Sequence, residues 1–138
     1  MIRSSTATWH GPGFNGEGRL TTNSNVLYDL PFNFNSRFGE GMTGTNPEEL
    51  LAAAHASCFT MKLSFVLGEA GFVAEFLKTI ANINFVNGNI VGSHLILSAK
   101  IPGINREIFD ESIADAERNC PVCRILNTKV TIEASVEF

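Results

Sequence analysis

The sequence predicts an α+β protein, and three patterns lead to that prediction. Residues 45–72 contain one long apolar helical pattern, and no second segment of that kind occurs in the 138 residues. Short stretches in which apolar and polar residues alternate precede and follow it, as expected of strands. The resulting order is two or three strands, a helix, two strands, a helix and a final strand, which is an α+β arrangement.

Length and composition indicate one domain that packs against another chain. The 138 residues fall within the size of a single domain, so we expect one domain over residues 1–138. Apolar residues make up 44% of the chain and charged residues only 17%, which is low for a small monomer. This composition predicts that apolar surface is buried between chains.

The net charge and the cysteine content of the chain indicate which partners and which cellular compartment to expect. The net charge is −4 and no basic run exists, which argues against nucleic acid as a partner. Residues 1–10 lack the apolar core of a signal peptide. The three cysteines are therefore expected to be reduced thiols in the cytoplasm, available for chemistry or packing.

The segment before the long helix predicts a β-meander and then a loop. Residues 2–10 and 18–23 are expected to be strands, joined by a Gly-Pro-Gly turn, with a short third strand over residues 26–30. Residues 31–44 are rich in Asn, Phe and Gly and predict an ordered loop, which carries Arg37.

The long helix has clear start and stop signals. Asn46 is a suitable N-cap, Pro47 falls at the first helical position, and Glu49 has the spacing of a capping box. Gly68 or Gly71 can end the helix in a left-handed conformation. The helix is apolar on nearly every face, so we expect it to be buried on nearly every side.

A transmembrane span is the competing interpretation of this helix. His55, Lys62 and Ser64 interrupt the apolar stretch, and acidic residues bound it at both ends. Small residues crowd its first half, which allows another helix or a sheet to approach closely. We therefore expect the central helix of a soluble protein, with no membrane partner.

The second half of the chain predicts a hairpin, a helix and a last strand. Residues 72–86 and 90–101 flank an Asn-Gly-Asn turn signal. Residues 105–119 have one apolar stripe at helical spacing, and Pro121 prevents that helix from continuing. Residues 130–138 alternate cleanly, which predicts a half-buried antiparallel strand.

The cysteines are the main candidates for chemistry. Cys58 has His55 three residues earlier on the same helix face, where a His can lower a thiol pKa but is more often a core residue. Cys120 and Cys123 form a C-x-x-C, which suits a redox pair or half a zinc site. No further paired ligands accompany it, so no metal is expected, and its place after a helix weakens a thioredoxin-like interpretation.

Four stretches of the chain form one distinctive combination: NSRF at 35–38, TNPEELLAAAHASCFTMKLSFVLGEAGF at 45–72, IPG at 101–103 and CPVCRIL at 120–126. Together they resemble the OsmC/Ohr family, the osmotically inducible and organic hydroperoxide resistance proteins. The NSRF loop and the AAHASCF core resemble the OsmC branch more than the Ohr branch. The resemblance covers most of the chain.

This resemblance implies a cysteine-based peroxidase without metal, haem or flavin. The family's peroxide-attacking cysteine matches Cys58, its resolving cysteine matches Cys120, and its arginine and glutamate match Arg37 and Glu48. The implied fold is an intertwined homodimer, with two long central helices wrapped by antiparallel β-sheets. The implied substrate is an organic hydroperoxide and the implied reductant an external dithiol.

The residue types suit that chemistry. A thiolate attacks the O–O bond, and the permanent charge of Arg37 favours the thiolate and the departing alkoxide. Glu48 would hold the guanidinium through a bidentate pair. Attack leaves a sulfenic acid on Cys58, and Cys120 condenses with it to a disulfide. Nearby aromatic rings are expected to favour alkyl hydroperoxides over hydrogen peroxide; the candidates are Phe32, Phe34, Phe38 and Phe59.

Helix geometry adds a hypothesis about the assembly. Glu48 and Cys58 are ten residues apart, hence about 15 Å along one helix. Both cannot contact one guanidinium within a single copy. If both serve one site, Glu48 comes from the other subunit.

Cys123 departs from the family pattern, which commonly has serine at this position. It permits a Cys120–Cys123 disulfide or a second resolving thiol, or it is an inert replacement for serine. Two alternative functions therefore remain: a disulfide oxidoreductase or redox sensor that uses Cys120 and Cys123, and a non-catalytic protein that binds an apolar ligand.

Overall fold

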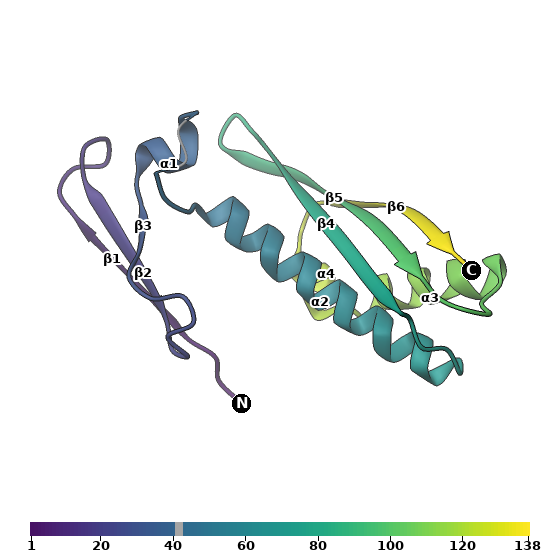
Figure 1. Cartoon of the computed structure of the whole chain (residues 1–138). Coiled ribbons are helices and arrows are strands. Elements are labelled where there is room, and N and C mark those ends of the chain that lie inside the picture. The colour runs from purple at the N-terminus through teal and green to yellow at the C-terminus, as the bar shows by residue number, and fades with distance from the viewer. Residues whose placement is uncertain (41–42) are drawn as a thin grey trace. The chain divides into compact units, whose positions relative to one another are not determined.

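In the computed structural model, which describes residues 1–40 and 43–138, the chain forms two compact units, Met1–Leu50 and Leu51–Phe138 (Figure 1). Each unit contains one three-stranded sheet, and helices accompany both, which confirms the α+β class. The single domain expected from chain length stays a prediction.

The first unit contains the predicted β-meander. Strands β1 (Ser5–His10), β2 (Glu17–Thr22) and β3 (Leu30–Phe32) pair antiparallel in the order β1-β2-β3. The third strand was predicted over residues 26–30 and begins later, because Leu27 is hydrogen-bonded back to Thr22 in a turn.

A short helix replaces part of the loop predicted over residues 31–44, of which 41–42 lie outside the described residues. Helix α1 (Phe34–Phe38) is held by a reciprocal capping box. The Ser36 amide donates to Asn33 Oδ1 at 2.7 Å, and the Asn33 amide donates to Ser36 Oγ at 2.9 Å. The Asn-x-x-Ser spacing was the sequence signal for this helix, and the loop prediction overlooked it.

Helix α2 (Pro47–Glu69) begins as predicted. The amide of Glu49 donates to Asn46 Oδ1 at 2.7 Å, so Asn46 is the N-cap. The Glu49 carboxylate accepts from Thr45 Oγ1 at 2.9 Å. The side chain expected to complete the capping box therefore bonds to Thr45.

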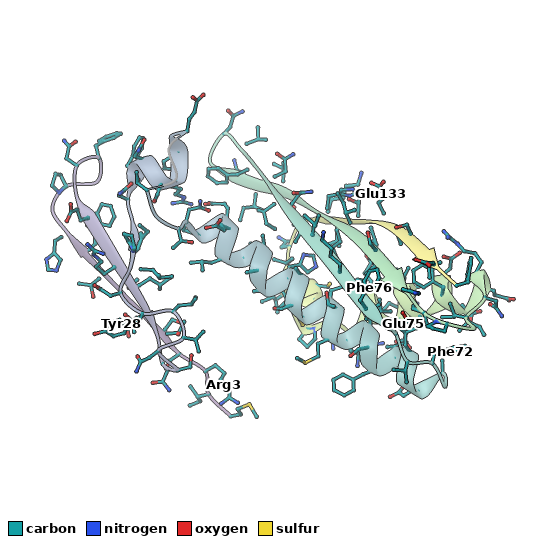
Figure 2. The ribbon with its side chains drawn as sticks, in the orientation of Figure 1. Arg3, Tyr28, Phe72, Glu75, Phe76 and Glu133 are labelled. Atoms are coloured by element: carbon teal, nitrogen blue, oxygen red, sulfur yellow. The ribbon has the colours of Figure 1, made fainter. Side chains whose placement is uncertain are left out.

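Gly71, rather than Gly68, ends α2. It has φ +89°, its amide donates to Gly68 O at 3.1 Å, and the amide of Phe72 donates to Leu67 O at 2.9 Å. These two bonds form a Schellman motif. Phe72, labelled in Figure 2, then packs its ring against the core.

The expectation that α2 is buried on nearly every side is wrong for the single chain. One stripe is buried, and it consists of His55, Phe59, Leu63, Val66 and Leu67. On the other faces Met61 and Phe65 are 64% and 63% exposed. By length and composition α2 could also cross a membrane; among the described residues it is the one such helix, and core helices of soluble proteins pass the same test.

The second sheet follows the order β4-β5-β6, with β4 (Phe76–Val86), β5 (Asn89–Lys100) and β6 (Lys129–Glu137). Asn87 (φ 51°) and Gly88 (φ 79°) form a two-residue turn between β4 and β5, which confirms the predicted hairpin. Thr60 Oγ1 of α2 donates to Thr79 Oγ1 of β4 at 2.7 Å, where the helix runs beside that strand (Figure 1).

The predicted antiparallel pairing of the last strand is wrong, because β6 runs parallel to β5. Helices α3 (Arg106–Asn119) and α4 (Pro121–Ile125) lie between the two strands in sequence. A helical crossover returns the chain to the same end of the sheet, so the next strand is parallel. The second sheet is therefore mixed.

The hydrophobic core of the described residues lies entirely within Leu51–Phe138. Alternate residues of β5 face α2 and α3 across it. Its fully or almost fully buried members are Phe59, Leu63, Val66, Leu67, Leu95, Leu97, Ala99, Ile101, Ile104, Phe109, Ala116 and Cys120. One of the three thiols is thus part of the core.

The Schellman motif predicts that alanine at Gly71 and alanine at Gly68 have different effects on the free energy of unfolding. Gly71→Ala should reduce the free energy of unfolding by about 1 kcal/mol, because an alanine is strained at positive φ. An added Cβ meets nothing within 4 Å at either Gly71 or Gly68. Gly68→Ala, inside the helix, should therefore be neutral or stabilising by up to about 1 kcal/mol. Urea unfolding measures the free energy of unfolding of both variants. Equal losses of stability would mean that packing, rather than the positive φ of Gly71, causes the destabilisation.

Candidate active site

The three cysteines, all free thiols, gather where the middle of α2 meets the junction of α3 and α4. Cys58 and Cys123 are half-buried and Cys120 is fully buried. Cys58 and Cys123 pack against the core cluster that contains Cys120, and the neighbouring Cys120 thiol raises the pKa of both. The structure therefore brings together the two cysteines that the family resemblance paired, although they are far apart in sequence.

The start of α4 positions these sulfurs. Cys120 is its N-cap, and Cys120 Sγ accepts from the Cys123 amide at 3.4 Å. Pro121 takes the first helical position, where its missing N–H costs nothing. The Val122 backbone, also in this first turn, favours negative charge on the Cys58 sulfur and lowers the pKa of that thiol.

Burial disfavours negative charge on the Cys58 sulfur. It raises the pKa of the Cys58 thiol, as does the neighbouring Cys120 thiol. The Val122 backbone and the positive charge of Lys62 lower it, and the pKa stays above its ordinary value. Burial likewise raises the pKa of Cys123. Cys58 and Cys123 are therefore thiols at neutral pH within this unit of the chain.

His55 contacts Cys123 rather than Cys58. Its Nε2 lies 2.9 Å from Cys123 Sγ, and its Nδ1 lies 2.7 Å from Ser93 Oγ of β5. The ring is fully buried, and burial lowers its pKa. The sequence indicated a core histidine, but no local signal pointed to Ser93 or Cys123 as its partners.

Arg37 and Glu48 form the predicted bidentate pair within Met1–Leu50. Arg37 Nη2 donates to Glu48 Oε1 at 2.7 Å, and Arg37 Nε donates to both carboxylate oxygens at 3.2 Å. Arg37 lies in the last turn of α1 and Glu48 in the first turn of α2. The two helix caps therefore fix the pair, while its catalytic role stays a prediction.

One aromatic ring lies beside the guanidinium, and further rings pack in a row from it. It lies 5.1 Å from the centre of the Phe38 ring. Phe34 stacks on both Phe38 and Phe14, with ring centres 4.9 Å apart in each pair. Phe14 was not among the expected residues. Phe59 is fully buried in the core, and its expected place near the substrate stays a prediction.

The remaining expected aromatic residue, Phe32, stacks on Trp9 with ring centres 5.6 Å apart. The structure thus places the arginine, the glutamate and three candidate rings in Met1–Leu50, and the thiols in Leu51–Phe138. Within the described part of the chain, no group of three or more His, Cys, Asp or Glu side chains could hold a metal ion.

A groove of about 800 Å³ runs between α2 and β4. Small and apolar side chains line it, including Ala53, Ala56, Met61 and Leu77. It lies on the part of α2 that the single chain leaves exposed. The groove is therefore an exposed apolar surface of Leu51–Phe138, beside the helix that carries Cys58.

Comparisons with known proteins agree with this arrangement. A family model described as OsmC-like protein matches residues 39–135. Peroxiredoxin OsmC of Escherichia coli is 41% identical over 131 residues, which cover 92% of this chain and 91% of that protein. Organic hydroperoxide resistance protein OhrB of Bacillus subtilis is 27% identical over 124 residues, covering 87% and 89%.

A solved structure supports the fold alone. The OsmC-like protein of Mycoplasma pneumoniae superposes with a TM-score of 0.79 at 11% identity. The match covers 100% of this chain and 99% of that chain.

The buried imidazole predicts how stability depends on pH. In the unfolded chain His55 binds a proton below about pH 6.5, whereas its lowered pKa keeps the folded ring neutral there. The unfolded state then binds more protons, so the free energy of unfolding falls as pH falls below that value. His55→Gln should reduce this slope by up to about 1.4 kcal/mol per pH unit. Urea unfolding between pH 5 and pH 8 measures it, and an unchanged slope would mean that folded His55 titrates normally.

Proposed function

The chain belongs to the OsmC-like protein family, and we propose that it is a cytoplasmic, homodimeric thiol peroxidase that reduces organic hydroperoxides to alcohols. The packing of Cys58 against the core cluster that contains Cys120 is the observation that carries the proposal. The names of the two relatives, a peroxiredoxin and an organic hydroperoxide resistance protein, support a peroxidase-type role.

The reaction begins at Cys58, the half-buried sulfur of the pair. Its thiolate attacks one oxygen of the hydroperoxide, the O–O bond breaks, and the alkoxide leaves as an alcohol after taking a proton. Cys58 is then a sulfenic acid. The Cys120 thiol condenses with it, which releases water and forms a disulfide. An external dithiol returns both sulfurs to thiols.

Arg37 supplies the charge that the thiol cluster lacks. Burial raises the pKa of Cys58, and the positive charge of Lys62 offsets this only in part. Thiolate formation therefore requires a further positive charge near the sulfur. A guanidinium provides a permanent charge and can also stabilise the departing alkoxide. Glu48 holds that guanidinium in one orientation through two parallel hydrogen bonds. The Phe38 ring beside it, and the Phe34 ring packed on Phe38, favour an alkyl group on the peroxide.

A second copy of the chain completes the site. Glu48 and Cys58 lie on one helix, about 15 Å apart at 1.5 Å per residue, so the Arg37–Glu48 pair cannot reach Cys58 of the same α2. The exposed apolar faces of α2 and the groove beside β4 are surfaces that a partner chain would cover. The low charge content of the chain supports the same proposal.

The three reduced thiols support a proposal for the cellular compartment and for the reducing partner. Three free cysteines suit a reducing environment, hence the cytoplasm, and a dithiol reductant available there. Metal, haem and flavin are absent from the proposed cycle, because two cysteines carry the oxidising equivalent between peroxide and reductant.

Disulfide mapping tests the function directly. Reduced protein treated with one equivalent of cumene hydroperoxide should consume it and form a Cys58–Cys120 disulfide. Cys58→Ser should lose both results, because no thiolate remains to attack. A Cys120–Cys123 disulfide that still forms in Cys58→Ser would instead support the disulfide oxidoreductase. Wild-type protein that leaves the peroxide untouched would support an apolar-ligand-binding protein.

Subunit mixing tests the shared site. Cys58→Ser and Glu48→Ala homodimers should each be impaired, while a heterodimer of the two should contain one intact site and regain about half the wild-type activity. Differently tagged chains, co-expressed and purified through both tags, provide the heterodimer. A heterodimer of two differently tagged Cys58→Ser chains is the matched control. Activity no higher than that of either parent would show that Glu48 and Cys58 act within one chain.

A further inference from the structure

The third thiol lies beside the two sulfurs of the proposed cycle. The Cys123 amide donates to Cys120 Sγ at 3.4 Å, Cys58 and Cys123 both pack against the core cluster that contains Cys120, and the Cys120 thiol raises the pKa of both. Cys120 is therefore the central sulfur of the three. In thiol–disulfide exchange the central sulfur is the one that is attacked, with the attacking thiol on one side and the leaving thiol on the other.

Cys123 also has a base in contact with its sulfur. With the ring proton on Nδ1, His55 donates to Ser93 Oγ at 2.7 Å and directs the Nε2 lone pair at Cys123 Sγ, 2.9 Å away. The buried ring is neutral, so that lone pair is free to accept the thiol proton. Cys123 thus has the Cys–His arrangement of an activated nucleophile.

The three sulfurs differ in how easily a reductant in solvent can reach them. Cys120 is fully buried and out of reach of a bulky reductant. Cys123 lines a surface cavity of about 410 Å³ together with Glu117, Arg118 and Arg124. A dithiol that approaches through this cavity meets Cys123 first.

We propose that Cys123 is a relay thiol that moves the disulfide from Cys58–Cys120 to Cys120–Cys123, where the external dithiol reduces it through this cavity. The inference rests on the proposed function, because the Cys58–Cys120 disulfide is its starting point. It assigns to Cys123, His55 and the cavity a second stage of the cycle.

The exchange balances without a further oxidant or reductant. Cys123 gives its proton to His55 Nε2, and its sulfur lone pair forms the bond to Cys120. The Cys58–Cys120 bond breaks, its electron pair stays on Cys58, and the proton from His55 is available to that sulfur. One disulfide and one thiol stand on each side. Cys58 is then free to meet the next peroxide while the oxidising equivalent waits in the C-x-x-C.

Time-resolved disulfide mapping tests the relay in the full-length protein. After one equivalent of cumene hydroperoxide, samples are quenched in acid at increasing times, alkylated and digested. The Cys58–Cys120 disulfide should appear first and give way to Cys120–Cys123, with Cys58 alkylated. Cys123→Ser should lose the second product and stop at Cys58–Cys120.

The outcomes separate the relay from the function on which it rests. A wild-type end product that remains Cys58–Cys120 overturns the relay and leaves the peroxidase cycle standing. Protein that forms no peroxide-dependent disulfide at Cys58 overturns both.

The pH dependence of the second step tests His55. The groups that act on Cys123 are His55 of α2, Cys58 of α2, Cys120 at the helix junction and Glu117 of α3. Wild-type exchange should be independent of pH above the pKa of His55. In His55→Gln it should rise about tenfold per pH unit, since only thiolate formed through solvent can attack. Identical pH profiles would exclude His55 as the base, and if His55→Gln does not fold, Cys123→Ser still decides the relay.

Discussion

The contact between Cys58 and Cys120 inside the packed core is the constraint on which the site depends. The disulfide proposed between them tolerates little error in the placement of its two Cβ atoms, so the proposal requires both residues to lie on rigid elements. Cys58 lies in the middle of α2, one residue before the fully buried Phe59. Cys120 is held where α3 ends and Pro121 starts α4. Core packing therefore sets the geometry of the chemistry.

The same burial that fixes the sulfurs opposes their ionisation. An apolar environment disfavours a thiolate, and the first turn of the short helix α4 and Lys62 offset this only in part. The strongly charged pair, Arg37 and Glu48, lies instead in the other unit, held by the caps of α1 and α2. The chain thus places the thiols and the charged pair in different units and in different surroundings.

Local signals predicted much of this structure, and non-local contacts account for the rest. Asn46, the Asn87-Gly88 turn and Pro121 act within a few residues, and each behaves as the sequence predicts. The direction of β6 depends on the crossover that precedes it, and the alternation of residues 130–138 alone does not contain that information. The contact of His55 with Cys123 spans 68 residues of sequence, so only the folded chain reveals it.

The N-terminal meander has a consequence for synthesis. Strand β1 is exposed along its whole length, and none of the core cluster lies in Met1–Leu50. Three strands without an apolar layer to pack on are not stable by themselves. Because residues 1–50 are synthesised before residues 51–138, this segment leaves the ribosome before any apolar surface of the core cluster has formed. The interval before that surface arrives is when the nascent chain is most exposed to proteases and to aggregation, and most dependent on chaperones.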